Sequence, residues 1–174
     1  MSHELLLNEE VYHRFIQKEV PEARRFVWIA TADVKDLHVA SGKRFVPFVQ
    51  VLARLVRDGV EVRLIHAKEP GPRFRKDFDQ YPEFVESDLF EQVLCPRMHM
   101  KVMIIDGVVA MVGSANLTGA GMGAKSPRRR NFEAGYLTRE ASEIGQLMDF
   151  YDRFWIGDYC GPCQRRDVCP GPLA

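Results

Sequence analysis

Residues 99–116 of the chain read HMKVMIIDGVVAMVGSAN. The apolar runs 102–105 and 108–112 flank the dipeptide Asp106-Gly107. An Asp-Gly pair between two apolar runs predicts a β-hairpin with a two-residue type I′ turn. This stretch therefore predicts two adjacent antiparallel strands joined by a tight turn.

The predicted hairpin brings polar side chains together at its open end. If the residues that flank the turn face each other, antiparallel pairing places Lys101 opposite Val112 and His99 opposite Ser114. Side chains at positions i and i+2 of a strand share a face, so one face carries His99, Lys101, Ser114 and Asn116. A candidate nucleophile, a fixed positive charge and two neutral hydrogen-bonding groups suit phosphate chemistry. We expect Asp106 to hold the turn and its local network rather than to touch substrate.

The spacing of these residues, H-x-K-x4-D-x6-G-S-x-N, resembles the HKD signature of the phospholipase D superfamily, residue for residue. The second element of that family, Asn-x-Glu, matches Asn131-Phe132-Glu133. The resemblance is close over residues 95–137 and extends elsewhere only to the order of strands and helices. It implies phosphodiester transfer through a covalent phosphohistidine.

The residue types support that chemistry. A neutral imidazole at His99 attacks phosphorus directly, so no metal is needed to make the nucleophile. Lys101 would neutralise the non-bridging oxygens, and Ser114 and Asn116 would add neutral donors where charge develops. We expect Glu133 to orient His99, as a carboxylate does in a hydrolase triad.

The motif occurs once in the chain. One histidine cannot act both as nucleophile and as leaving-group acid without moving away from its own adduct. Superfamily members with two copies solve this within one chain, and small single-motif members pair as homodimers. The resemblance therefore implies a homodimer in which two His99 side chains face each other, one attacking and one protonating.

Length and composition are those of an ordinary globular domain. The chain has 174 residues, with hydrophobic and charged contents of 46% and 28%, which suffice for a real core. No apolar run is long enough to span a bilayer and no signal-peptide pattern is present, so we expect a cytoplasmic protein. We assign residues 1–158 to a phospholipase D-like catalytic domain and residues 159–174 to a cysteine-rich tail packed on it.

Positive charge gathers near the motif although the net charge is zero. Four basic residues lie between the two parts of the motif: Lys125, Arg128, Arg129 and Arg130. Such a run is commonly a solvated surface loop. Its position beside the expected phosphate site equally favours a sequence-indifferent, salt-sensitive contact with a nucleic-acid backbone.

Apolar periodicity predicts alternating strands and helices. Strands at 25–30 and 60–66, with a helix at 45–57 between them, form a βαβ unit and hence a parallel pair. The other predicted elements are helices at 8–18 (Asn8 as N-cap), 73–81 and 139–156, and strands at 90–94 and 132–137. Both faces of the hairpin are apolar away from the motif. We therefore predict an α/β protein, an α-β-α sandwich whose mixed sheet is covered by helices on both faces.

The four cysteines form a candidate metal site. Cys160, Cys163 and Cys169 make a C-x2-C-x5-C pattern, and Cys95 lies four residues before His99. In an intracellular chain, clustered cysteines favour metal over disulfides, and four thiolates satisfy either zinc or an iron–sulfur cluster. The pattern resembles the iron–sulfur staple of AddB-type nucleases. We expect a [4Fe–4S] cluster first, structural zinc second and unligated thiols third.

These features lead to one main functional hypothesis and two alternatives. The main hypothesis is a homodimeric nuclease that cleaves nucleic-acid phosphodiester bonds without a metal. The alternatives are a phospholipase or phosphatidyltransferase, and a nucleic-acid-binding module whose metal cluster senses redox state. The sequence has no amphipathic basic helix or membrane anchor to favour lipid. The complete set of His99, Lys101, Asn116 and Glu133 favours catalysis over binding alone.

Overall fold

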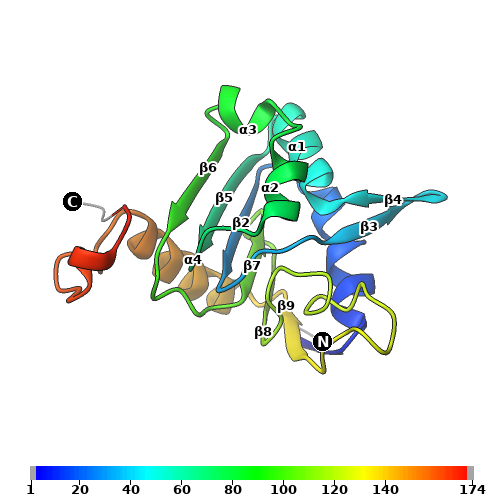
Figure 1. Cartoon of the computed structure of the whole chain (residues 1–174). Helices are drawn as coiled ribbons and strands as arrows, with labels where there is room; N and C mark the ends of the chain where they lie inside the picture. Colours follow the sequence, from blue (N-terminus) through cyan, green and yellow to red (C-terminus); the bar gives the residue numbers. More distant parts are fainter. Residues whose placement is uncertain (1–2, 172–174) are drawn as a thin grey trace.

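A mixed sheet of seven strands forms the centre of the fold (Figure 1). The computed structural model describes residues 3–171, so the predicted domain limits include positions 1–2 and 172–174 that lie outside the described residues. The strand order is β1-β9-β8-β7-β2-β5-β6. The strands are β1 (His3–Leu7), β2 (Phe26–Thr31), β5 (Glu61–His66), β6 (Phe90–Leu94), β7 (Val102–Ile105), β8 (Val109–Gly113) and β9 (Ala134–Thr138).

Helices join the parallel strands and cover the sheet. β2, β5 and β6 run parallel, and the other neighbouring strands pair antiparallel. The helix between β2 and β5 completes the predicted βαβ unit. The helices are α1 (Phe48–Arg57), α2 (Pro72–Phe78), α3 (Glu83–Glu86), α4 (Ala141–Trp155), a π-helix (Val11–Ile16) and two 3-10 turns (Val20–Glu22 and Arg166–Val168).

The sheet divides the apolar core into two layers. On one face, Ile29 belongs to a large cluster with Phe15 of the π-helix and Leu52 of α1. On the other face, Ile104 of β7 packs with Ile144 of α4. Because both faces of the central strands are apolar, both are buried under helices. This arrangement confirms the predicted α-β-α sandwich.

The hairpin of β7 and β8 turns where the sequence predicts. Asp106 and Gly107 have φ angles of 56° and 71°, as both central positions of a type I′ turn require. However, Ile105 pairs with Val109 and not with Val108. Val108 is 59% exposed and acts as one extra residue on the β8 side, like a bulge.

This extra residue displaces every cross-strand pair. Val112 pairs with Val102 and not with Lys101. The predicted opposition of His99 and Ser114 is therefore wrong as well. Both residues lie beyond the ends of the paired strands, where loop geometry and not strand alternation sets the direction of a side chain.

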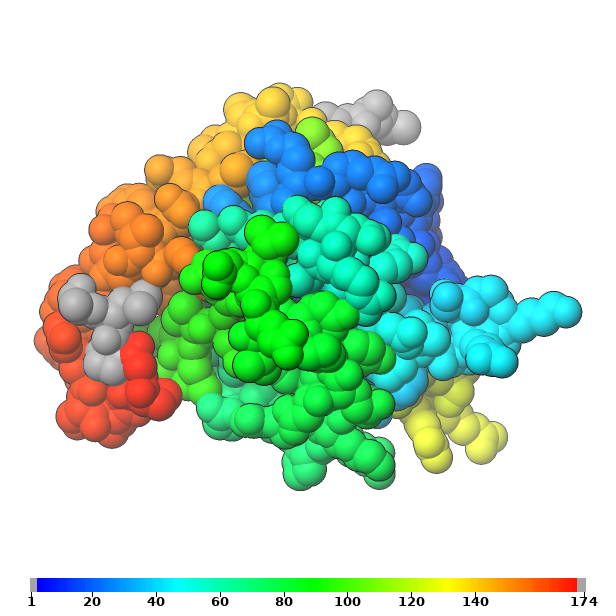
Figure 2. All heavy atoms as spheres, turned by 90° about the horizontal axis from the view of Figure 1, so that it is seen from above, coloured from blue at the N-terminus to red at the C-terminus, as the bar shows by residue number. Residues whose placement is uncertain are grey.

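A second hairpin replaces the start of the predicted helix 45–57. Arg44–Pro47 forms β4, which pairs with β3 (His38–Ser41), and the helix begins at Phe48 after Pro47. This hairpin projects from one end of the molecule, and the C-terminal segment lies at the other end (Figure 2). From residue 3 to residue 171, no helix is both long and apolar enough to cross a membrane.

The N-terminal segment also differs from the prediction. Asn8 does not cap a helix; it has a φ of 52° and directly follows β1, and the predicted helix 8–18 shortens to the π-helix. β1 itself was not predicted. It is an edge strand whose Leu5 and Leu7 are 66% and 45% exposed, while Leu6 between them is buried in the core, so both pairing with β9 and burial of this one side chain hold it.

Candidate active site

The motif residues lie at the edge of the sheet where the parallel strands β2, β5 and β6 end. Antiparallel pairing puts the start of β7, the end of β8 and the start of β9 at this same edge. Lys101 stands directly before β7, Ser114 and Asn116 follow β8, and Glu133 stands directly before β9. In open α/β sheets, ligands bind at this carboxyl edge.

His99 and Lys101 form the open centre of the site. The Lys101 ammonium lies 3.2 Å from Nδ1 and 3.3 Å from Nε2 of the His99 ring, and it donates to the His99 carbonyl oxygen at 2.7 Å. Burial lowers the pKa of Lys101, and the negative charge of Glu133 opposes this shift. His99 is exposed, so a phosphate can approach the imidazole beside a cation.

Glu133 binds Ser114. The Ser114 hydroxyl donates a short hydrogen bond to Glu133 Oε2, and Asn131 Nδ2 donates to Glu133 Oε1 at 3.0 Å. Within the described part of the chain, no hydrogen bond joins Glu133 to His99, so the predicted orienting contact is not formed inside one chain. The Glu133 charge acts on Lys101 through space.

Close approach of β8 and β9 brings Ser114 and Glu133 together. Ser114 N donates to Ala134 O at 3.0 Å, and Ala134 N donates to Ser114 Oγ at 3.1 Å. A Cβ added to Gly113 would lie 2.8 Å from both Ala134 O and Gly135 Cα. Only glycine allows this separation of the two strands.

Asn8 fixes Glu133 from the other end of the chain. Asn8 N donates to Glu133 O at 2.9 Å, and Glu133 N donates to Asn8 Oδ1 at 3.1 Å. Asparagine tolerates the positive φ at this position better than most residues. Sequence reasoning missed this role because 125 positions separate the two residues and no local pattern marks their contact.

The loop after β2 holds Asn116. Its Oδ1 accepts hydrogen bonds from the backbone N–H groups of Ala32 and Asp33, both at 3.2 Å, and from Thr31 Oγ1 at 3.3 Å. Because these donors occupy Oδ1, the amide nitrogen is the part of the side chain left to donate to a ligand.

A carboxylate and two lysines stand beside Asn116. Asp33 pairs with Lys35 at 2.8 Å and with Lys68 at 3.4 Å. Burial raises the pKa of Asp33, but the hydrogen bonds and charges of the two ammonium groups outweigh burial and lower the pKa overall. Both lysine side chains are more than half exposed, at 58% and 62%. Sequence reasoning missed this group, whose one signal is its position just after two predicted parallel strands.

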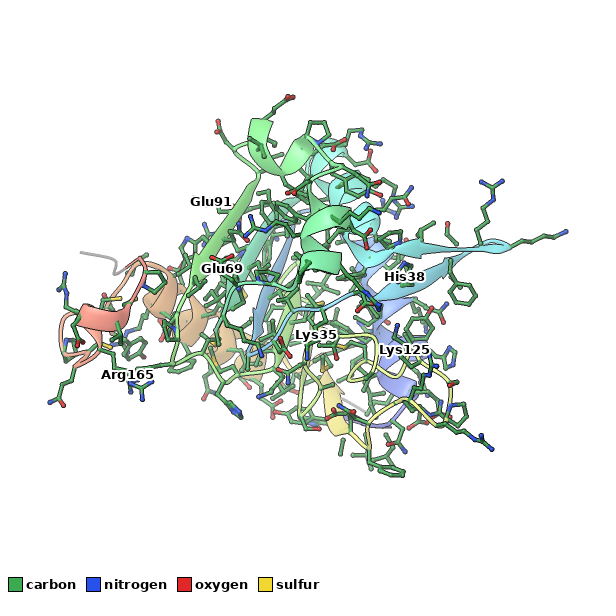
Figure 3. The ribbon with its side chains drawn as sticks, viewed as in Figure 1. Lys35, His38, Glu69, Glu91, Lys125 and Arg165 are labelled. Carbon is green, nitrogen blue, oxygen red and sulfur yellow. The ribbon has the colours of Figure 1, made fainter. Side chains whose placement is uncertain are left out.

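The predicted basic loop is partly neutralised. Lys125 pairs with Asp36 at 3.3 Å, and Arg130 pairs with Glu9 at 3.1 Å. Because Asp36 follows Lys35 in the chain, the first pair brings Lys125 to the loop that carries Lys35 (Figure 3). The exposed cations of this loop are Arg128 and Arg129.

The aspartate of the motif, Asp106, lies at the opposite edge of the sheet. Its carboxylate accepts hydrogen bonds from the backbone N–H groups of residues 24–26, at the start of β2. It is thus separated from His99 and Lys101 by the length of β7.

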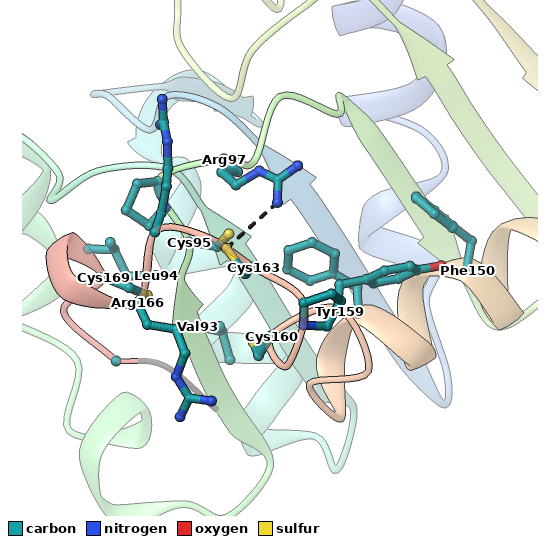
Figure 4. Close-up of a pocket in the computed structure, with 15 residues that line it drawn as sticks. Val93, Leu94, Cys95, Arg97, Phe150, Tyr159, Cys160, Cys163, Arg166 and Cys169 are labelled. Carbon is teal, nitrogen blue, oxygen red and sulfur yellow. Dashed lines mark hydrogen bonds between the residues drawn. The ribbon is translucent and has the colours of Figure 1, made fainter. Parts of the chain in front are cut away.

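All four cysteines line one cavity of about 440 Å³ at the end of β6 (Figure 4). They are free thiols, and Arg97 Nη1 donates to Cys163 Sγ at 3.6 Å. Among the residues that the structure describes, no group of three or more histidine, cysteine, aspartate or glutamate side chains is arranged to hold a metal ion.

Comparisons with known proteins agree with this architecture. A family model described as "Cardiolipin synthase, PLD-like domain" matches residues 16–155. A sequence comparison with curated proteins finds no match.

Three solved structures are similar in fold. NucT from Helicobacter pylori has a TM-score of 0.62 and 17% identity, over 87% of this chain and 94% of that chain. Nuc from Salmonella typhimurium, a phospholipase D family member, has a TM-score of 0.61 and 13% identity, over 88% and 93% of the two chains. TrmBL2, an archaeal chromatin protein with a novel mode of DNA binding, has a TM-score of 0.59 and 10% identity, over 89% of this chain and 52% of that chain.

Proposed function

The chain belongs to the PLD-like domain family described for cardiolipin synthase, and from this premise we propose that it is a phosphodiesterase that cleaves nucleic acid through a phosphohistidine at His99. The observation that carries the proposal is the placement of His99, Lys101 and Asn116 at one open edge of the sheet. An imidazole nucleophile, an ammonium group and a fixed amide donor are the groups that metal-independent phosphoryl transfer needs.

The proposed reaction has two displacements at phosphorus. In the first, a His99 ring nitrogen attacks, a P–N bond forms, and the bond to the leaving oxygen breaks as that oxygen takes a proton from an acid. In the second, water attacks, the P–N bond breaks, and a phosphate monoester leaves with His99 restored. The group that gave the first proton accepts one from this water. Lys101 and the Asn116 amide stabilise the charge on the non-bridging oxygens.

We propose that the acid is His99 of a second copy, because the attacking histidine is bonded to phosphorus when the leaving group needs its proton. Large apolar side chains beside the site support a dimer: Phe132 is 96% exposed, and the cross-strand pair Leu5 and Tyr136 is 66% and 38% exposed. A mixed dimer with His99→Asn in one copy should lose nearly all turnover. A fully active monomer in sedimentation at assay concentration would contradict this arrangement.

Nucleic acid is the proposed substrate because the site is bordered by cations that can follow a polyanion. Lys35 and Lys68 pair with Asp33, whose backbone N–H donates to Asn116, and Arg128 and Arg129 are exposed on the loop that carries Lys125. Such contacts bind the phosphate backbone without reading its sequence.

Phosphatidyl transfer is the second candidate, and the family description favours it. The chemistry would be the same, with a lipid alcohol in place of water in the second displacement. The exposed Leu5 and Phe132 could then contact acyl chains instead of a second copy. A nucleic-acid-binding module without turnover is the third candidate.

A substrate panel separates these candidates. The wild-type protein and His99→Asn would be assayed in parallel on single-stranded DNA, duplex DNA, RNA and phosphatidylglycerol vesicles. We expect cleavage of at least one nucleic acid by the wild type alone, and none of the lipid. Turnover of the lipid only would establish the second candidate, and tight nucleic-acid binding without turnover would establish the third.

A further inference from the structure

No residue of the C-terminal segment, residues 160–171, belongs to the apolar core. None of its residues is buried, and its only half-buried residues are Cys160, Cys163 and Cys169. The aromatic packing of Tyr159 on Phe150 and Phe154 stops just before the segment. The three cysteines are therefore the side chains of this segment that are least exposed to solvent.

The fourth cysteine, Cys95, lines the same cavity from the end of a strand of the sheet. Cys95 directly follows β6, and its N–H donates to the carbonyl oxygen of His66 at the end of β5, at 2.8 Å. Every cysteine of the chain thus lines the same cavity, although Cys95 and the tail are far apart in sequence (Figure 4). Free cysteines that cluster from distant segments of a chain are typical of a metal site.

The arrangement suits a group larger than one ion. A tetrahedral zinc site holds its four sulfurs at about 2.3 Å from the metal and hence about 3.8 Å from each other. Within residues 3–171, no three such ligands converge in the way that one ion requires. The four thiols line a cavity of about 440 Å³, which has room for more than one ion. An iron–sulfur cluster spreads its four thiolate ligands around a core of iron and sulfide.

Charge and polarity around the cavity fit the same group. Four thiolates on a cluster carry net negative charge, and the cavity is lined by Arg97, Arg165 and Arg166. Arg97 already donates to the Cys163 sulfur. Val93 and Phe154 line the apolar part of the wall, which would shield the cluster from water.

We propose that Cys95, Cys160, Cys163 and Cys169 together hold a [4Fe–4S] cluster that fastens the C-terminal segment to the carboxyl end of β6. The ligand thiols bind in their deprotonated form, so binding releases their protons to solvent. The cluster takes no part in phosphodiester cleavage. Its consequence for the active site is mechanical, because only Pro96, Arg97 and Met98 separate Cys95 from His99, so the position of Cys95 constrains that of His99.

Metal analysis of the full chain tests the proposal. Protein purified without oxygen should be brown and contain about four irons and about four acid-labile sulfides per chain. Cys163→Ser and Cys169→Ser should each lose most of that iron. Gln164→Ala, beside Cys163 but exposed and without a thiol, is the matched control and should keep it.

Three results of these measurements would contradict the proposed cluster. Colourless protein with about one zinc per chain, or metal-free protein with four titratable thiols, would overturn the cluster. Full iron content in both serine variants would also overturn it. None of these measurements depends on turnover, so an inactive protein with a cluster, or an active one without it, distinguishes this proposal from the proposed function.

Discussion

Asp106 and Phe26 are joined by a reciprocal pair of hydrogen bonds: Phe26 N donates to Asp106 Oδ1 at 2.9 Å, and Asp106 N donates to Phe26 O at 3.0 Å. The same carboxylate accepts from Arg24 N and Arg25 N, both at 2.8 Å. The aspartate of the motif therefore starts β2 and closes the hairpin turn. The residues proposed for chemistry lie at the other end of β7.

Asp106→Ala should lower stability without altering the chemical step. Three backbone N–H groups lose their acceptor, and alanine disfavours the positive φ at this position. The free energy of unfolding should therefore fall by about 2 kcal/mol or more. Urea unfolding and kcat at low temperature check this. Asparagine tolerates the positive φ and keeps one acceptor oxygen, so the stability of Asp106→Asn should lie between those of the wild type and Asp106→Ala. A fall in kcat at unchanged stability would place Asp106 in the chemistry instead.

His99→Asn should abolish turnover and leave the fold intact. The ring is exposed, so its loss removes little packing, and stability should change by less than about 0.5 kcal/mol. Loss of the nucleophile should lower kcat by roughly a thousandfold or more. His13→Asn, an exposed histidine on the π-helix, is the control and should keep full activity. Wild-type turnover should survive EDTA, and inhibition that magnesium reverses would exclude this mechanism.

The alkaline limit of activity should depend on Lys101. Burial lowers its pKa, so the ammonium loses its proton at a lower pH than an ordinary lysine does. Since the charged form is the one that neutralises the phosphate, kcat/KM should fall as pH rises through that lowered pKa. Lys101→Arg keeps its charge to higher pH, so its remaining activity should persist further into the alkaline range. An identical alkaline limb in both proteins would rule out Lys101 as the group responsible.

Lys35→Ala and Lys68→Ala should weaken substrate binding more than catalysis. Each removes one cation that we propose to bind the phosphate backbone, so KM should rise several-fold with little change in kcat. The slope of log affinity against log salt should fall by about one per lysine. Binding titrations at several salt concentrations measure this slope. Lys18→Ala, exposed beyond the π-helix, is the matched control. If its slope falls equally, the two lysines have no special role.

Gly113→Ala should separate β8 from β9. The new Cβ would lie 2.8 Å from backbone atoms of the facing strand, and backbone cannot rotate away, so we expect a loss of about 1–3 kcal/mol together with lower activity. Gly145→Ala in α4, where nothing lies within 4 Å, should instead be neutral or stabilising by up to about 1 kcal/mol. Thermal unfolding measures the stability of both variants. Equal stability of the two would show that the fold does not need the close approach of β8 and β9.

The sequence by itself determined the hairpin, its turn at Asp106-Gly107 and the sandwich of a mixed sheet between helices. These features follow from the period of apolar residues and from turn chemistry, which are properties of neighbouring residues. The same pattern located the proposed nucleophile, because His99 and Lys101 lie just before the first strand of the hairpin. It did not predict β1 or the β3–β4 hairpin, because each buries only one side chain fully, Leu6 and Val39, and depends on pairing between strands.

Only the tertiary structure decided which polar groups meet. One extra residue beside the turn, Val108, displaced the register and removed the expected opposition of His99 and Ser114. Glu133 forms hydrogen bonds with Ser114 and Asn8, and Asn116 accepts hydrogen bonds from the loop that carries Asp33. These contacts form where strands from distant segments end side by side, and no local period of the sequence reports which ends the sheet will bring together.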